Sequence, residues 1–187
     1  CRNKKTNERT KWNFKDGNLW NFWVYGNSYN SSSDRSSGTI MKISEEGLEL
    51  IKQFEGCETK AYLCPAGVWT IGYGHTKDVK EGEEISEEYA MFLLKDEIVE
   101  YEKYIEDLVE VSLSQCEFDA LCSWVYNLGP TNLKESTLLK ELNHANFDRV
   151  PFEIKRWNKA GGKVLEGLQR RREAEALLFE AKDWSKV

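Results

Sequence analysis

Glu55 has the chemistry and the local setting of a catalytic acid. It stands with Gly56 at the predicted end of a helix that Ser44 can cap, and the apolar positions Leu48, Ile51 and Phe54 of that helix follow helical spacing. A glutamate placed there against an apolar wall would keep its proton near neutral pH, because burial and the negative end of a helix dipole both disfavour the carboxylate. A glutamate at a helix end is usually only solvated, so Glu55 by itself does not define a site.

Cys64 and Thr70 are the next residues that could do chemistry. They fall in a predicted hairpin over residues 58–76, with Thr70 in its second strand after a turn at 65–67. A cysteine thiolate is a nucleophile, but a free thiol with its pKa near 8.5 is mostly protonated at neutral pH. A threonine hydroxyl can orient a water molecule, although threonine is also an ordinary strand residue.

The elements that must position these residues are mainly helical. Helical patterns cover residues 86 to about 106, 114–128, 136–142, 147–157 and 167–182. Pro151 limits the regularity of the helix over 147–157, and residues 161–162 are predicted to form a loop. A hairpin followed by helices predicts an α+β fold, in which a small hairpin lobe and a mostly helical lobe enclose a cleft.

The charge distribution excludes some classes of partner. Residues 1–40 carry seven basic and three acidic side chains, whereas the remainder carries 19 basic and 29 acidic ones, a net charge of −10. An acidic body argues against nucleic-acid binding, which requires neutralisation of phosphates. No apolar run reaches about 18 residues and no signal peptide is visible, so we expect neither a spanning helix nor a stable membrane anchor. The expected state is a monomer.

The cysteines and histidines do not form a metal-binding pattern. The five cysteines are an odd number at irregular spacing, no Cys-x-x-Cys pair is present, and His75 and His144 are far apart. We therefore expect no metal and no cofactor. Cys116 and Cys122 are interpreted as small apolar residues on a helix.

Residues 1–40 differ from the rest of the chain. They are rich in asparagine and serine and contain seven aromatic side chains, whereas residues 41–187 have regular patterns. We therefore divide the chain into an N-terminal extension with a linker, 1–40, and a catalytic domain, 41–187. The extension is interpreted either as a poorly ordered leader or as a binding appendage, for a sugar polymer or a receptor, because exposed aromatic side chains suit stacking on sugars.

Several motifs occur together in the order typical of one enzyme family. They are Phe54-Glu55-Gly56 and the run 61–76, followed by the runs 115–121, 126–129, 136–139, 156–162 and 167–172. This set resembles the phage-type lysozymes of glycoside hydrolase family 24, the muramidases known as endolysins. The resemblance covers residues 42 to about 181.

The resemblance implies cleavage of the β-1,4 bond between N-acetylmuramic acid and N-acetylglucosamine in peptidoglycan. Glu55 would protonate the leaving oxygen, and Thr70 would help to place the attacking water. Many relatives have aspartate at the position of Cys64, while a subset has cysteine. The residues expected at the substrate are Tyr62, His75, Gln115, Asn127 and Arg170, although His75 is more simply interpreted as a link between the lobes.

Three interpretations of function remain open at this stage. The first is an endolysin that a holin releases from the host cytoplasm to the periplasm or wall during lysis. The second is a bacteriocin or tail-associated muramidase that residues 1–40 target, and the third is a weakly active peptidoglycan-binding module.

Two further features bear on regulation and on substrate contact. A disulfide at Cys64 would remove its nucleophile and give redox control, with Cys57 and Cys1 as candidate partners. The basic cluster of Lys159, Lys163 and residues 170–172 either contacts carboxylated stem peptides or is a solvated surface, and at least one arginine must point inward.

Overall fold

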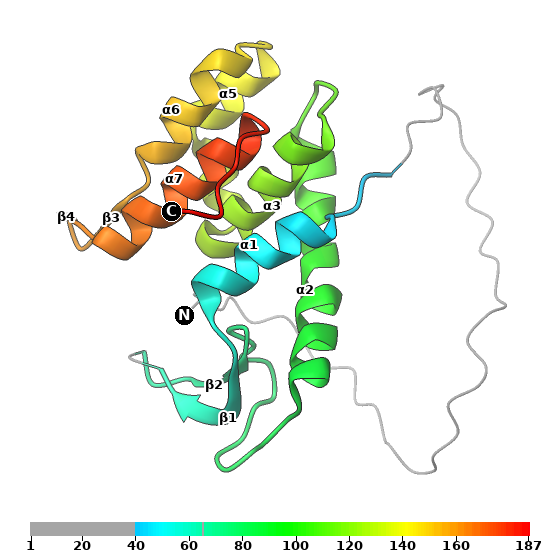
Figure 1. The fold of residues 1–187 in the computed structure, drawn as a ribbon, viewed down its shortest axis with the longest axis vertical. Helices are drawn as coiled ribbons and strands as arrows, with labels where there is room; N and C mark the ends of the chain where they lie inside the picture. Colours follow the sequence, from blue (N-terminus) through cyan, green and yellow to red (C-terminus); the bar gives the residue numbers. More distant parts are fainter. Residues whose placement is uncertain (1–39, 65) are drawn as a thin grey trace, which may run out of the picture. The chain divides into compact units, whose positions relative to one another are not determined.

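The computed structural model describes residues 40–64 and 66–187, and Met41–Val187 form one compact unit. The expected extension therefore lies outside the described residues, apart from Ile40. Figure 1 shows a small hairpin beside the lower half of a long helix, with the other helices gathered above it. The elements are α1 Glu45–Glu55, β1 Glu58–Leu63, β2 Trp69–Gly72, α2 Glu87–Leu108, α3 Gln115–Leu128, α4 Pro130–Glu135, α5 Thr137–Asn143, η1 Phe147–Arg149, α6 Val150–Lys155, β3 Lys159–Ala160, β4 Lys163–Val164 and α7 Glu166–Phe179.

Serine side chains begin four of these helices. The hydroxyl oxygen of each accepts a hydrogen bond from a backbone N–H in the first turn, which that turn cannot otherwise satisfy. The capping residues are Ser44, Ser86, Ser114 and Ser136. At α3 the cap is reciprocal, because the side chain of Glu117 accepts from the Ser114 backbone. The predicted starts of α1, α2, α3 and α5 are confirmed.

The hairpin lobe is a small antiparallel sheet. β1 and β2 pair with Tyr62 opposite Thr70, and the register is irregular between Glu58 and Tyr62. Ile85 N–H donates to the Thr59 carbonyl at 2.9 Å, so the segment before α2 lies along the outer edge of β1. The sequence predicted both strands and the turn that joins them.

The helical lobe is built around α3. Nine consecutive residues of α3, Phe118 to Tyr126, are buried, so helices cover every face of it. The indole of Trp124 packs edge-on against Trp157, with 5.1 Å between ring centroids. Figure 1 shows α1, α7 and α2 around α3, an arrangement that brings the end of α1 close to α7.

Some short elements differ from the sequence pattern. Residues 161–162 form a turn, as the predicted loop requires, and both glycines have positive φ, 56° and 78°, but the short strands β3 and β4 that this turn joins were not predicted. The pattern over 147–157 divides into η1 and α6, with Pro151 tolerated in the first turn of α6. The last helix ends at Phe179, three residues earlier than predicted. Elements of two to six residues contain too few positions to show a period.

Two side chains join the hairpin lobe to the helical lobe. His75 lies 2.8 Å from Glu97 Oε1 of α2 through Nδ1, and 2.9 Å from the Lys77 carbonyl through Nε2. The Glu97 hydrogen bond raises the pKa of His75, and this effect exceeds the opposing effect of burial. The Tyr126 hydroxyl of α3 donates to the Tyr73 carbonyl at 2.9 Å. The interpretation of His75 as a link between the lobes therefore fits the geometry.

The first turn of α1 leaves no room for a side chain at position 47. A Cβ placed on Gly47 would lie 2.8 Å from the Asp119 Cβ and 2.7 Å from Ile43 Cγ1. Asp119 cannot retreat, since its carboxylate accepts hydrogen bonds from the Ser44 backbone and hydroxyl. Gly47 therefore permits the close packing of α1 on α3.

We expect Gly47→Ala to destabilise the protein by about 2 kcal/mol, because overpacking outweighs the better helix propensity of alanine. Gly167→Ala is the matched control, since nothing lies within 4 Å of its added Cβ in the first turn of α7. That change should stabilise by roughly 0.5 kcal/mol. Urea unfolding measures both free energies, and a Gly47→Ala variant as stable as wild type would contradict the packing argument.

We expect Glu97→Gln to lower the free energy of unfolding by about 1–2 kcal/mol at pH 6. A raised pKa in the folded state stabilises the fold fully below the unfolded pKa of His75, 6.5, and this contribution disappears as pH rises through the folded value. The loss should therefore shrink toward pH 9. Thermal unfolding across this range measures it.

Glu45→Gln is the control for this prediction, because its ion pair with Lys95 is exposed. An exposed pair contributes little, so its removal should have a small effect at every pH. A Glu97→Gln deficit that stays constant from pH 6 to pH 9 would be inconsistent with the assigned role of His75.

Candidate active site

Glu55 is the last residue of α1, and two glycine turns leave its carboxylate accessible. Gly56 ends the helix with φ 68°, and Gly74, with φ 94°, brings the turn after β2 close to the carboxylate. A Cβ on Gly74 would lie 3.7 Å from Glu55 Oε2. The side chain of Glu55 is 22% exposed, so this carboxylate can reach a bound molecule from a partly enclosed position.

The partner of Glu55 in the structure is a cation and not an apolar wall. Arg171 Nη1 of α7 donates to Glu55 Oε1 at 2.7 Å. The same guanidinium lies near the Phe54 ring, with 5.9 Å between Arg171 Cζ and the ring centroid. The local setting of Glu55 is therefore an ion pair, because α7 brings an inward arginine to the end of α1.

The ion pair continues into the helical lobe. Glu175, which is fully buried, accepts from Arg171 Nε at 3.2 Å and pairs with Arg172 Nε at 2.8 Å. The Ser123 hydroxyl of α3 also donates to Glu175, at 2.8 Å. We call Glu55, Arg171, Arg172 and Glu175 the charge cluster. Two of the three consecutive arginines thus point inward.

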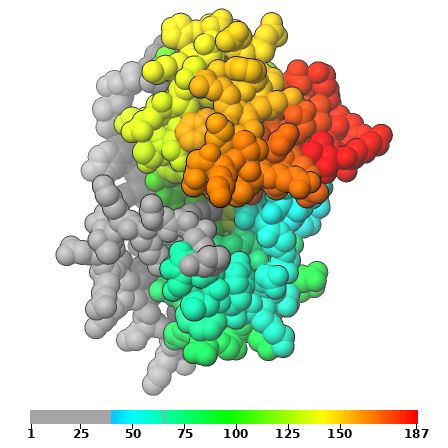
Figure 2. Space-filling view, turned by 90° about the vertical axis from the view of Figure 1, so that its left-hand side faces the viewer, coloured from blue at the N-terminus to red at the C-terminus, as the bar shows by residue number. Residues whose placement is uncertain are grey.

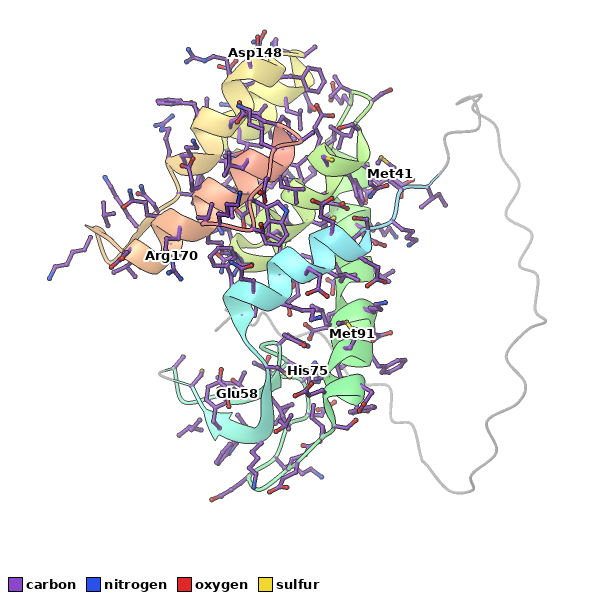
Figure 3. The ribbon with its side chains drawn as sticks, viewed as in Figure 1. Met41, Glu58, His75, Met91, Asp148 and Arg170 are labelled. Carbon is purple, nitrogen blue, oxygen red and sulfur yellow. The ribbon has the colours of Figure 1, made fainter. Side chains whose placement is uncertain are left out.

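Asn127 and Arg170 take different positions around this cluster. Asn127 Oδ1 accepts a hydrogen bond from Arg172 Nη2 at 3.0 Å. Asn127 was expected to contact substrate, but in the structure this oxygen binds the charge cluster to α3. Arg170 is exposed (Figure 3), one residue before the arginine that binds Glu55. Figure 2 shows the β3–β4 segment and the start of α7, in orange, facing the β1–β2 hairpin, in cyan. Arg170 is therefore available for contact with a ligand, and Asn127 is already occupied.

Cys64 and Thr70 lie together at the base of the β1–β2 turn. The Val68 carbonyl accepts from the Cys64 backbone N–H at 3.0 Å and from the Thr70 hydroxyl at 3.1 Å. Both residues are buried, with exposed fractions of 4% and 3%. The structure thus brings these two predicted residues to one carbonyl group.

The sulfur of Cys64 is disulfide-bonded, so in this state it is not a thiolate. Cys57 is a free, half-buried thiol, and the prediction that it could pair with Cys64 is wrong in this structure. Cys1, the other candidate, lies outside the described residues. Cys122 is fully buried, as predicted for an apolar helix position, whereas Cys116 is half-buried.

Tyr62 stands opposite Thr70 on β1 and near Glu55. Burial, followed by the negative charges of Glu58 and Glu55, raises the pKa of the Tyr62 phenol. The side chain is exposed and the phenol keeps its proton at neutral pH, so it can donate a hydrogen bond. Glu55, Thr70 and Tyr62 therefore belong to one region.

The side chains of Gln115 and His75 are held by contacts outside this region. Gln115 is at the start of α3, where its amide donates to the Lys42 carbonyl and to Asp119, each at 2.8 Å. These hydrogen bonds hold the beginning of the domain beside the first turn of α1, whereas Glu55 is at the other end of that helix. This placement does not support the expectation that Gln115 contacts substrate. His75 lies between the hairpin and α2 (Figure 3), where both ring nitrogens have protein partners.

Sequence reasoning missed the roles of Arg171 and Glu175. A signal was present, because residues 171 and 175 are four apart on a helix and residues 172 and 175 are three apart, spacings that place side chains together. That spacing usually marks a solvated surface pair, and only the tertiary fold buries this one. In the described part of the chain, no group of three His, Cys, Asp or Glu side chains could hold a metal. Among the same residues, no helix has the length and hydropathy to cross a membrane.

Comparisons with known proteins agree with this geometry. The Phage lysozyme family model matches residues 52–175. An endolysin of Acyrthosiphon pisum secondary endosymbiont phage 1 is 44% identical over 145 residues, which cover 75% of this chain and 99% of that protein. An endolysin of Bacillus phage B103 is 48% identical over 74% of this chain, but the match spans only 54% of that longer protein.

A solved structure of a point mutant of P22 lysozyme has a similar fold. Its TM-score is 0.70 and its sequence identity 37%, with 75% of this chain and 99% of that chain covered. The expected lysozyme-like α+β architecture is therefore confirmed. The family model and these relatives show that the chain belongs to the phage lysozyme family and is an endolysin-type muramidase.

Proposed function

We propose that this muramidase cleaves the β-1,4 bond between N-acetylmuramic acid and N-acetylglucosamine, with Glu55 as the acid. The observation that supports this most directly is the placement of Glu55: its carboxylate is partly exposed at the end of α1, between Arg171 and the turn at Gly74. A glycosidase acid must protonate the leaving oxygen as the bond breaks. In the free protein Arg171 Nη1 donates to Glu55 Oε1 at 2.7 Å, so Glu55 would have to act as the acid from within this ion pair.

The hairpin would supply the second half of the reaction. We assign Thr70 to the placement of the attacking water, for which its hydroxyl must exchange the Val68 carbonyl for water. Tyr62 and Arg170 are exposed and would contact the sugar and the carboxylated stem peptide. Lys159 and Lys163, both exposed on the β3–β4 hairpin, would add to the same anionic recognition.

The place of action follows from the substrate. Peptidoglycan lies outside the host cytoplasmic membrane, so an enzyme made in the host cytoplasm must leave it to reach the wall. We infer lysis of the host cell as the outcome. We also propose that a holin releases the enzyme and that the enzyme acts as a monomer.

We expect Glu55→Gln to lower the rate of peptidoglycan hydrolysis by at least about 100-fold, because glutamine cannot supply the proton. The measurement is the release of reducing N-acetylmuramic acid ends from purified peptidoglycan. Glu58→Gln is the matched control, since it changes an exposed glutamate on β1 and should retain activity. A Glu55→Gln enzyme with the wild-type rate would overturn the assignment of the acid.

Cys64 is the residue through which we propose redox control. A thiol reductant would split the disulfide, releasing the Cys64 thiol and becoming oxidised itself. Reduction would allow the base of the hairpin, where Val68 binds both Cys64 and Thr70, to open toward substrate and water. The disulfide is thus assigned to a less active state.

Reductant should raise the wild-type rate several-fold. Cys64→Ser should be active without reductant and should not respond to it, while Cys57→Ser, which changes a free thiol, should respond as wild type does. Mass spectrometry of non-reduced digests identifies the linked peptides. If hydrolysis is indifferent to reductant and no linked peptide is found, the proposal of redox control fails.

A further inference from the structure

Glu175 is a fully buried carboxylate that does not face the substrate region. Its Oε1 accepts from the Ser123 hydroxyl at 2.8 Å, from Arg172 Nη2 at 2.9 Å and from Arg171 Nε at 3.2 Å. Its Oε2 lies 2.8 Å from Arg172 Nε. A buried charge must be paired, and contacts to both carboxylate oxygens fix the orientation of this one.

Arg171 links this carboxylate to Glu55 through a single planar group. Its Nε donates to Glu175, its Nη2 donates to the Ser123 carbonyl at 3.4 Å, and its Nη1 donates to Glu55 at 2.7 Å. Because a guanidinium is planar, two of these contacts fix the direction of the third. Glu175 and the Ser123 carbonyl therefore aim Arg171 at Glu55.

We propose that Glu175 is a positioning residue for the reaction: it orients Arg171 and balances its charge, so that Glu55 can be held in place and still carry a proton. This inference rests on the proposed role of Glu55 as the acid. Glu175 itself touches neither substrate nor reacting atoms.

The charges of the cluster support the second part of this proposal. With Glu55 ionised, the two arginines and two glutamates sum to zero. With Glu55 protonated, one positive charge remains, and without Glu175 two would remain in a largely buried site. Removing Glu175 would therefore favour the charged form of Glu55, since two cations would then face it with no second anion.

The partners of the cluster on α3, Ser123 and Asn127, are neutral. On β1, Tyr62 responds to the charges of Glu58 and Glu55, and its own phenol is neutral. Burial lowers the pKa of Arg172, whereas Glu175 raises it. Glu175 is thus the main counter-charge of Arg172, and it shares Arg171 with Glu55.

The test is Glu175→Gln, which keeps the shape and removes the charge. We expect the kcat of the pure enzyme on soluble, uncrosslinked peptidoglycan to fall by about tenfold or more, with KM changed less than twofold. The reason is that a wrongly oriented Arg171 would displace Glu55, which affects the reaction more than substrate binding. The high-pH limb of the kcat profile should move to lower pH by about one unit, since Glu55 loses its proton more easily.

Glu153→Gln is the matched control. Glu153 is also buried, and it forms an i,i+3 ion pair with Arg156 on α6, outside the charge cluster. Both variants should lose thermal stability, but only Glu175→Gln should move the pH profile. A Glu175→Gln profile that superimposes on the wild-type profile, or that matches Glu153→Gln, would overturn the positioning role.

Ser123→Ala is the second test of the positioning role, for the case in which Glu175→Gln does not fold. This change removes one hydrogen bond to Glu175 and keeps every charge, so kcat should fall several-fold with KM unchanged and the pH limb in place. An unchanged kcat would overturn the proposal. If Glu55→Gln is inactive while these variants are normal, only the role of Glu175 fails; if Glu55→Gln is active, the proposed function itself fails.

Discussion

The requirement that buried charges be paired constrains this domain more than any other interaction. Glu175 and Arg172 are fully buried, and neither can be accommodated unless the other is in place. The charge cluster and the residues that bind it come from three helices, α1, α3 and α7, which are far apart in the sequence. The charge cluster can form only when these helices are correctly packed, so the fold and the position of Glu55 depend on the same contacts.

This dependence explains why the candidate acid stands at a helix end instead of on a loop. α1 is fixed at its start, where Asp119 accepts hydrogen bonds from Ser44 and where Gly47 allows close packing on α3. It is fixed at its end by Arg171. A catalytic side chain on a helix held at both ends keeps its position without help from the substrate.

The parts of the fold that could be predicted from sequence are those with a local cause. Serine caps, helical periodicity and the turn segment 65–67 each act over a few residues, and they located the hairpin and the long helices. The motifs also pointed to Glu55, Cys64 and Thr70 together. The partner of Glu55 could not be predicted in this way, because Arg171 is 116 residues away and only the packing of α7 on α3 selects it from three consecutive arginines.

The two halves of the candidate site are secured by different chemistry. The half around Glu55 depends on buried ion pairs, which salt screens little. The half around Thr70 belongs to a small sheet, which is stable only when packed on the helices. His75 and Tyr126 provide that packing through Glu97 and the Tyr73 carbonyl. Because the pKa of His75 is raised by Glu97, this link weakens as the solution becomes alkaline. The hydrogen bond from Tyr126 to the Tyr73 carbonyl does not depend on that proton, so the two links between the lobes respond differently to pH.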